Sequence, residues 1–238
     1  MPTSCALLLR LDGVLHNSDL PVQSFARHLT EALPAELVRP MIAGMRGFLE
    51  NKPELLPVGA DFGAAEDGYQ AVEHLALSAG LSPQHITAAY RASRRDLSGS
   101  AWAVDAQDGL PELLAGLSPD VALAVYAEPG DPAAPAVLEA VELGQVELFA
   151  APLPGIIDQL LGRLDPASRP DRILVVGTRW DGELDLAAAA GCRTALVDRY
   201  RRRRGSPDVR AADLAGLTEH IRSWAGLTKI AADGGRNP

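Results

Sequence analysis

Residues 173–198 read ILVVGTRWDGELDLAAAAGCRTALVD, two apolar runs on either side of an Ala-rich segment. The first five residues, ILVVG, form a continuous apolar run, which is typical of a strand buried on both faces of a parallel sheet. An Ala-rich helical segment follows at 183–191, where Gly191 is placed as a helix C-cap. A second apolar run, TALVD, occupies 194–198. The stretch therefore predicts a strand–helix–strand unit of an α/β protein.

Earlier parts of the chain repeat this alternation. The runs CALLLRL at 5–11 and VALAVY at 121–126 predict two further buried strands. Helical patterns at 132–143 and 153–164 lie between the second run and the strand at 173–177. Strands that alternate with helices predict a doubly wound parallel sheet.

The interval from 20 to 100 has a different pattern. It contains helical segments at 24–33, 66–80 and 82–97 and no convincing strand. A helical block inserted after the first strand predicts a cap over the strand ends, where doubly wound sheets bind ligands. We therefore expect an α/β core at 1–18 and 101–225 and a helical cap at 19–100. The remaining residues, 226–238, are expected to form a flexible tail.

Composition limits the classes of partner. The chain of 238 residues carries a formal net charge of −9, which argues against nucleic acid because phosphate neutralisation needs a basic face. No apolar run is long enough to span a bilayer, and the N-terminus lacks the features of a secretory signal. The two cysteines form no CxxC pair, so neither a disulfide framework nor a thiolate zinc site is indicated. We expect a cytoplasmic protein with no membrane or nucleic-acid partner.

Residues 10–15, RLDGVL, follow the first predicted strand. Together with the order of elements and the 173–198 stretch, they resemble the haloacid dehalogenase superfamily, in its phosphoglycolate phosphatase and β-phosphoglucomutase-like branch. The resemblance covers about residues 5 to 220 and implies an α/β core with a helical cap. It also implies phosphoryl transfer by an Asp nucleophile, an Asp acid/base two residues later, a Ser or Thr, a Lys, and Asp residues that bind Mg²⁺. The cations are needed because an anionic nucleophile must approach a negatively charged phosphoryl group.

The first motif departs from the family pattern at its most important position. Arg10 stands where the resemblance places the nucleophile, whereas Asp12 keeps the acid/base position and Gly13 fits the turn. In an alternative register Asp12 would be the nucleophile, but Val14 would then replace the acid/base. A guanidinium has no nucleophilic lone pair at any biological pH.

The other motifs are changed as well. Tyr126 follows the second strand in place of Ser or Thr, and Ala151 stands in the place of the family Lys. In the fourth motif, Thr178 and Glu183 take the positions of the two Asp residues. The resemblance therefore identifies a pocket of Gly13, Tyr126, Ala151, Thr178 and Glu183 around Arg10 and Asp12, without a metal site.

Together these changes predict a haloacid dehalogenase-like protein that has lost phosphoryl transfer and is retained to bind a small anionic ligand or a protein partner. No cofactor is expected, and Mg²⁺ binding should be weak or absent. The alternative is an atypical hydrolase in which Asp12 activates water and Arg10 binds the substrate anion. Whether the chain is an enzyme is therefore left open by the sequence.

Two roles are possible for Arg10. Its guanidinium could replace the metal as an internal cation between Asp12 and Glu183, or its side chain could extend to solvent. His16, just beyond DGVL, could face the pocket or be an exposed turn residue.

A basic run, RYRRRR, occupies 199–204 directly after the last predicted strand. Its arginines at 201, 202 and 203 are candidates for binding an anion at the ligand edge of the sheet. The alternative is a solvated, mobile loop, because like charges at this density repel one another.

Overall fold

The computed structural model describes residues 4–52, 62–99, 104–164 and 169–233. By its internal contacts the chain divides into two units, residues 1–17, 105–130 and 138–238 on the one hand, and residues 18–104 and 131–137 on the other. The first unit contains the sheet and the second contains a helical block, and each is described by itself. This division places residues 131–137 with the helical block, whereas they were predicted to belong to the α/β core.

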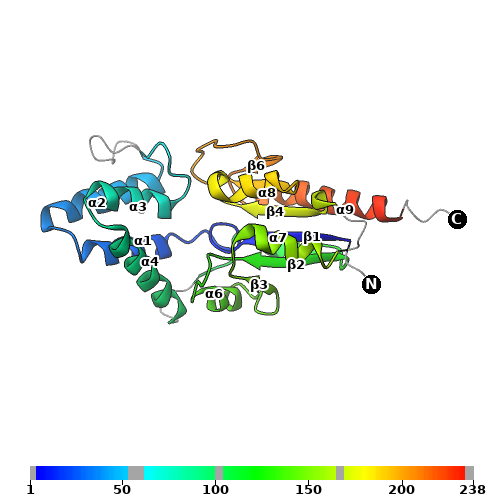
Figure 1. Cartoon of the computed structure of the whole chain (residues 1–238), viewed down its shortest axis with the longest axis horizontal. Helices are drawn as coiled ribbons and strands as arrows, with labels where there is room; N and C mark the ends of the chain where they lie inside the picture. Colours follow the sequence, from blue (N-terminus) through cyan, green and yellow to red (C-terminus); the bar gives the residue numbers. More distant parts are fainter. Residues whose placement is uncertain (1–3, 53–61, 100–103, 165–168, 234–238) are drawn as a thin grey trace. The chain divides into compact units, whose positions relative to one another are not determined.

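The α/β unit is built on a six-stranded sheet in which every neighbouring pair is parallel (Figure 1). The strand order is β3-β2-β1-β4-β5-β6, with helices on both sides of the sheet. The strands are β1 (Cys5–Arg10), β2 (Val121–Tyr126), β3 (Glu147–Phe149), β4 (Ile173–Gly177), β5 (Arg193–Val197) and β6 (Val209–Ala211). The predicted α/β fold class is confirmed.

The helices of this unit are α5 (Leu110–Ala115), α7 (Leu153–Leu161), α8 (Asp185–Ala189) and α9 (Thr218–Asp233). A further helix, α6 (Ala134–Ala140), is divided between the two units, because residues 131–137 are grouped with the helical block. Helix α9 includes residues 226–233, where the predicted flexible tail begins, and residues 234–238 lie outside the described part of the chain. Within the described ranges, no helix has both the length and the apolar character that crossing a membrane requires.

The complete burial of β1 explains its position in the middle of the sheet. All six of its residues are buried, and Leu7, Leu8 and Leu9 are completely inaccessible to solvent. Successive side chains of a strand point to opposite faces, so the apolar run Cys5–Leu9 must be covered on both sides of the sheet. On one face, Leu8 packs in a cluster with Ile156 and Leu160 of α7.

The order in which strands are added to the sheet reverses between β1 and β4. From β1 the chain proceeds to β2 and β3 on one side, and it then returns to β4 on the other side of β1. Doubly wound sheets bind ligands at the carboxyl ends of the strands where this reversal occurs. The residues that follow β1 and β4 therefore occupy the position in the fold where a site is expected.

The helical unit contains α1 (Leu20–Thr30), α2 (Ala35–Leu49), α3 (Gly68–Ser78) and α4 (Pro83–Ser98). Their apolar faces form a separate core that includes Phe25, Leu29, Met45 and Val72. A buried ion pair lies in this unit: Arg94 has no exposed surface and donates from Nε to Oδ1 of Asp131 at 2.9 Å, and its Nη2 donates to Oδ2.

Candidate functional site

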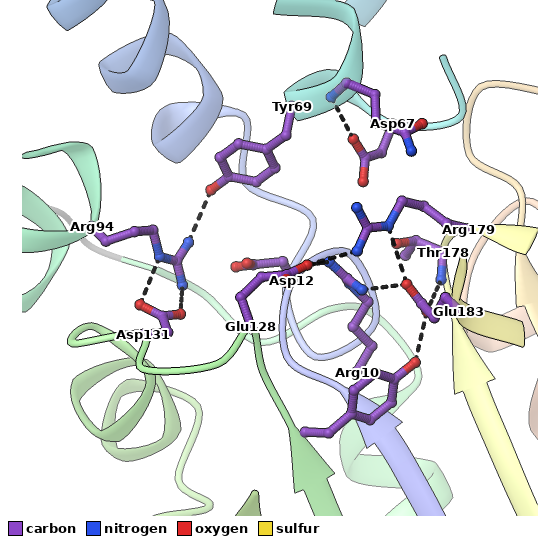
Figure 2. A network of polar contacts seen from close by, with 12 residues as sticks. Arg10, Asp12, Asp67, Tyr69, Arg94, Glu128, Asp131, Thr178, Arg179 and Glu183 are labelled. Atoms are coloured by element: carbon purple, nitrogen blue, oxygen red, sulfur yellow. Dashed lines mark hydrogen bonds and ion pairs between the residues drawn. The ribbon is translucent and has the colours of Figure 1, made fainter. Parts of the chain in front are cut away.

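Arg10 is the last residue of β1, and its side chain is only 7% exposed. One terminal nitrogen, Nη1, donates to Oε2 of Glu183, and the other, Nη2, donates to Oε1 of Glu128 at 2.9 Å. Figure 2 shows the guanidinium directed toward these carboxylates. The side chain does not extend to solvent, so that alternative for Arg10 is wrong.

Glu183 is the acceptor at the centre of the site. It lies in the segment Trp180–Leu184 after β4 and is 3% exposed. Its Oε1 accepts from the hydroxyl of Tyr126 at 2.6 Å and from the backbone N–H of Thr178 at 3.2 Å. With Arg10 on Oε2, the carboxylate is bound on both oxygens, as a buried charge requires.

Arg179 closes the network. Its Nη2 donates to Oε1 of Glu128 at 2.6 Å, and its Nε donates to Oε2 of Glu183 at 3.2 Å. Two arginines and two glutamates thus form a ring in which each cation contacts both anions, and their formal charges sum to zero. We call Arg10, Glu128, Arg179 and Glu183 the Arg–Glu ring.

The ring perturbs two titratable groups. Burial, and then the negative charge of Glu183, raise the pKa of Tyr126 well above its ordinary value of 10.0, so this hydroxyl remains a donor. Burial alone would raise the pKa of Glu128, but the charges of Arg10 and Arg179 outweigh it, and the pKa lies below the ordinary value of 4.5. Glu128 is therefore ionised at neutral pH.

The lowered pKa of Glu128 predicts a pH dependence of stability. Because the folded-state pKa is below 4.5, the contribution of Glu128 is fully present above pH 4.5 and is lost as the pH falls through the folded-state value. Urea unfolding across this window should show the stability advantage of the wild type over Glu128→Gln shrinking as the pH falls. An advantage that is the same at all these pH values would show that the ion pairs of Glu128 contribute nothing.

Gly177, the last residue of β4, is required by the close approach of Glu183. A Cβ at this position would lie 1.9 Å from Oε1 of Glu183 and 2.8 Å from the Tyr126 hydroxyl. Both are shorter than real contacts of a Cβ atom, so the carboxylate rests directly on the backbone of β4.

We expect Gly177→Ala to lower the free energy of unfolding by about 1–3 kcal/mol, because overpacking displaces the Glu183 carboxylate from the ring. Gly155→Ala is the matched control: it lies in α7 with no atom within 4 Å of its Cβ position. This control should be neutral or stabilising by up to about 1 kcal/mol, since Ala is the better helix former. Urea denaturation of both variants measures the difference, and equal stabilities would contradict the close approach.

Asp12 lies beyond the end of β1, in the turn that contains Gly13. Its Oδ1 is 2.9 Å from Nε2 of His16, which is 2% exposed. Gly13 has a φ of +80° and donates its N–H to the carbonyl of His16, and a Cβ on it would lie 2.7 Å from Cγ2 of Thr178. His16 is thus a buried partner of Asp12, and the interpretation of it as an exposed turn residue is wrong.

The remaining site predictions fall in different places. Ala151 follows β3 and packs against the apolar core of the sheet. Arg201, Arg202 and Arg203 lie in the loop between β5 and β6. The structure therefore brings together Arg10, Tyr126, Thr178 and Glu183, while the three arginines belong to a separate loop.

The structure was compared with solved structures, and the sequence was compared with protein families and curated proteins. No protein-family model matches the sequence, and no curated protein matches it. A conserved haloacid dehalogenase-like protein of unknown function from Agrobacterium tumefaciens has 18% sequence identity and a TM-score of 0.62, over 92% of this chain and 98% of that one. The chain has the haloacid dehalogenase-like fold.

Two further solved structures have this fold. A predicted phosphoglycolate phosphatase from Haemophilus somnus is 18% identical, with a TM-score of 0.58 over 91% of this chain and 97% of that one. CbbY from Rhodobacter sphaeroides, as a variant in complex with xylulose-1,5-bisphosphate, is 17% identical, with a TM-score of 0.57 over 91% of this chain and 96% of that one. At these identities the likeness concerns the fold and leaves the chemistry to the residues of the site.

Those residues do not fit the Mg²⁺ that the haloacid dehalogenase-like fold implies. A hard cation needs several carboxylate oxygens directed at one point. Here Glu128 and Glu183 each contact two guanidinium groups, and Asp12 contacts His16. Within the described part of the chain, no group of three or more His, Cys, Asp or Glu side chains is arranged to hold a metal ion.

Sequence reasoning missed Glu128, Arg179 and the burial of His16. Glu128 lies two residues after the end of β2, and Arg179 lies two residues after the end of β4. Charged residues just past buried parallel strands gather at one edge of the sheet, and that signal could have identified both. Glu128 lies outside the family motifs and Arg179 stands at an unspecified position of the fourth motif, so the motif positions alone do not identify either residue.

Proposed function

We propose that this chain has lost the phosphoryl-transfer chemistry associated with the haloacid dehalogenase-like fold and acts by binding a ligand or a protein partner. The observation that carries the proposal is the buried guanidinium of Arg10 at the end of β1, bonded to Glu128 and Glu183. This is the position that the family resemblance assigns to the attacking carboxylate. A guanidinium cannot attack phosphorus, because it has no lone pair available at biological pH.

The rate acceleration that a hydrolase loses with its nucleophile is large enough to support an inactive site. Removal of a nucleophile from a hydrolase costs on the order of 10⁶ in rate, or about 8 kcal/mol of barrier. The ring also satisfies both glutamates with protein cations, so neither carboxylate is left to be neutralised by Mg²⁺. Nucleophile and metal positions are thus both replaced by internal ion pairs.

A substrate panel tests the proposal. The purified protein is incubated with phosphoglycolate, sugar phosphates and p-nitrophenyl phosphate, with and without Mg²⁺, and released phosphate is measured. We expect no turnover above the buffer rate in either condition. Metal-dependent turnover that persists through purification and disappears in Asp12→Asn would overturn the proposal.

One observation favours a second candidate, an atypical hydrolase. The carboxylate of Asp12 lies 2.9 Å from the imidazole of His16, and a carboxylate–imidazole pair can take a proton from water. In this candidate Arg10 binds the substrate anion, with N–H groups other than those that it donates to Glu128 and Glu183. Metal-independent turnover that is abolished equally by Asp12→Asn and His16→Phe would favour this candidate over the binding function.

A further inference from the structure

The loop that joins β5 to β6 concentrates positive charge on an acidic protein. Five of the six residues at 199–204 are arginines, whereas the whole chain has a formal net charge of −9. Parallel strands end at one edge of the sheet, so this loop leaves β5 at the carboxyl edge. We call residues 199–205 the arginine loop.

The backbone of the arginine loop is fixed by Asp198, a residue that is 8% exposed. Its Oδ1 accepts from the backbone N–H of Arg202 at 2.7 Å, and its Oδ2 accepts from that of Arg203 at 2.8 Å. Nη1 of Arg210, on β6, also donates to Oδ2 at 2.8 Å. Nη2 of Arg210 also donates to the carbonyls of Arg204 and Gly205, so the backbone of the loop that the sequence could also predict as solvated and mobile is hydrogen-bonded in its middle and at its far end.

This fixed backbone holds two arginines in an uncommon conformation. Arg201 and Arg203 have φ values of +53° and +55°, in the left-handed region that residues with a Cβ rarely adopt. Strain of this kind persists only where the surroundings impose it, and it is concentrated at functional positions. Both side chains are exposed, and neither forms an ion pair with any residue in the described ranges.

The far end of the arginine loop rests on Trp180, which follows β4. Gly205 has a φ of +66°, and a Cβ on it would lie 1.9 Å from Cδ2 of the Trp180 indole. Trp180 itself packs against the apolar core of the sheet. The arginine loop is therefore anchored to the segment that also carries Arg179 and Glu183 of the Arg–Glu ring.

We propose that the arginine loop is a docking surface for an acidic segment of a partner protein, with Arg201 and Arg203 as its contact residues. The proposal rests on the binding function proposed above and identifies the class of its partner. Guanidinium groups bind carboxylates through two parallel hydrogen bonds, and a fixed loop loses little entropy on binding. Nucleic acid is disfavoured because the rest of the chain is acidic and repels a phosphate backbone.

The test uses a fluorescent oligoglutamate peptide as the probe and fluorescence anisotropy as the readout, with full-length protein at low and high salt. Arg201→Asn/Arg203→Asn removes the two charges, and Asn tolerates the left-handed conformation, so the loop is preserved. The control Arg39→Gln/Arg91→Gln removes the same charge from exposed helical positions. We expect the loop variant to weaken binding by about tenfold or more and the control by less than about twofold.

Three further measurements complete the test: the affinity of a lysine variant, the binding of an oligothymidine, and phosphatase turnover. Arg201→Lys/Arg203→Lys keeps the charge but loses the planar fork, and an intermediate affinity is expected. Unchanged affinity in the Asn variant, or tighter binding of an oligothymidine with the same number of charges, would overturn the proposal. Peptide binding and phosphatase turnover are measured separately, so phosphatase activity would refute the proposed function while leaving the docking result to be judged by its own affinities.

Discussion

Replacing Arg10 by methionine is expected to lower the free energy of unfolding by about 3 kcal/mol, because it removes one of the two cations that each glutamate of the ring contacts. Glu183 is 3% exposed, and its Oε2 would retain only the longer bond from Arg179, at 3.2 Å. Methionine keeps most of the volume of the side chain, so the loss reports the charge rather than a cavity. Urea unfolding followed by circular dichroism gives the value.

Two further variants show whether the loss comes from the unpaired charge. Arg10→Met/Glu183→Gln removes cation and anion together and should recover a large part of the lost stability. Arg163→Met is the matched control, because its ion pair with Glu147 is about half exposed on both sides. Exposed pairs contribute about 0–1 kcal/mol. A loss at Arg10 no larger than the loss at Arg163 would show that the Arg–Glu ring does not stabilise the fold.

Restoring an aspartate at position 10 is expected to leave the protein without phosphatase activity. Arg10→Asp supplies a carboxylate at the end of β1, but it places that carboxylate beside Glu128 and Glu183 with only Arg179 to balance three negative charges. Ala151 still supplies no cation for the phosphoryl group, and Tyr126 remains bonded to Glu183. Because these deficits persist, turnover should stay at the background rate.

The measurement compares wild type and Arg10→Asp on p-nitrophenyl phosphate over a range of Mg²⁺ concentrations. We expect both rates to equal the background, and the variant to be the less stable protein because it lacks the central cation of the ring. Arg10→Asp/Asp12→Asn serves as the control for contaminating phosphatase. A gain of about 10² or more in the single variant that the double variant loses would show that one substitution alone silences the site.

The sheet could be predicted where the strands are long and apolar. The runs at 5–11, 121–126, 173–177 and 194–198 correspond to β1, β2, β4 and β5, because strands covered on both faces exclude polar residues. The edge strands β3 and β6 could not be predicted. ELF and VRA are three residues long and partly exposed, which is too short for any periodicity to appear.

Only the site residues that stand at family motif positions could be predicted. The resemblance indicated Arg10, Tyr126, Thr178 and Glu183, and the structure places them within one network. It could not indicate Glu128, because the ring joins residues more than a hundred positions apart and its closure depends on how far each strand extends. Side-chain partners across strands follow from the register of the sheet, which the sequence alone does not specify.

A high-resolution crystal structure grown in excess Mg²⁺ tests the proposal that the Arg10 guanidinium takes the place of the nucleophile and the metal. We predict a guanidinium between the carboxylates of Glu128 and Glu183, with no divalent ion coordinated by either. A Mg²⁺ ion bound to Asp12 and Glu183, with Arg10 displaced from them, would contradict the account.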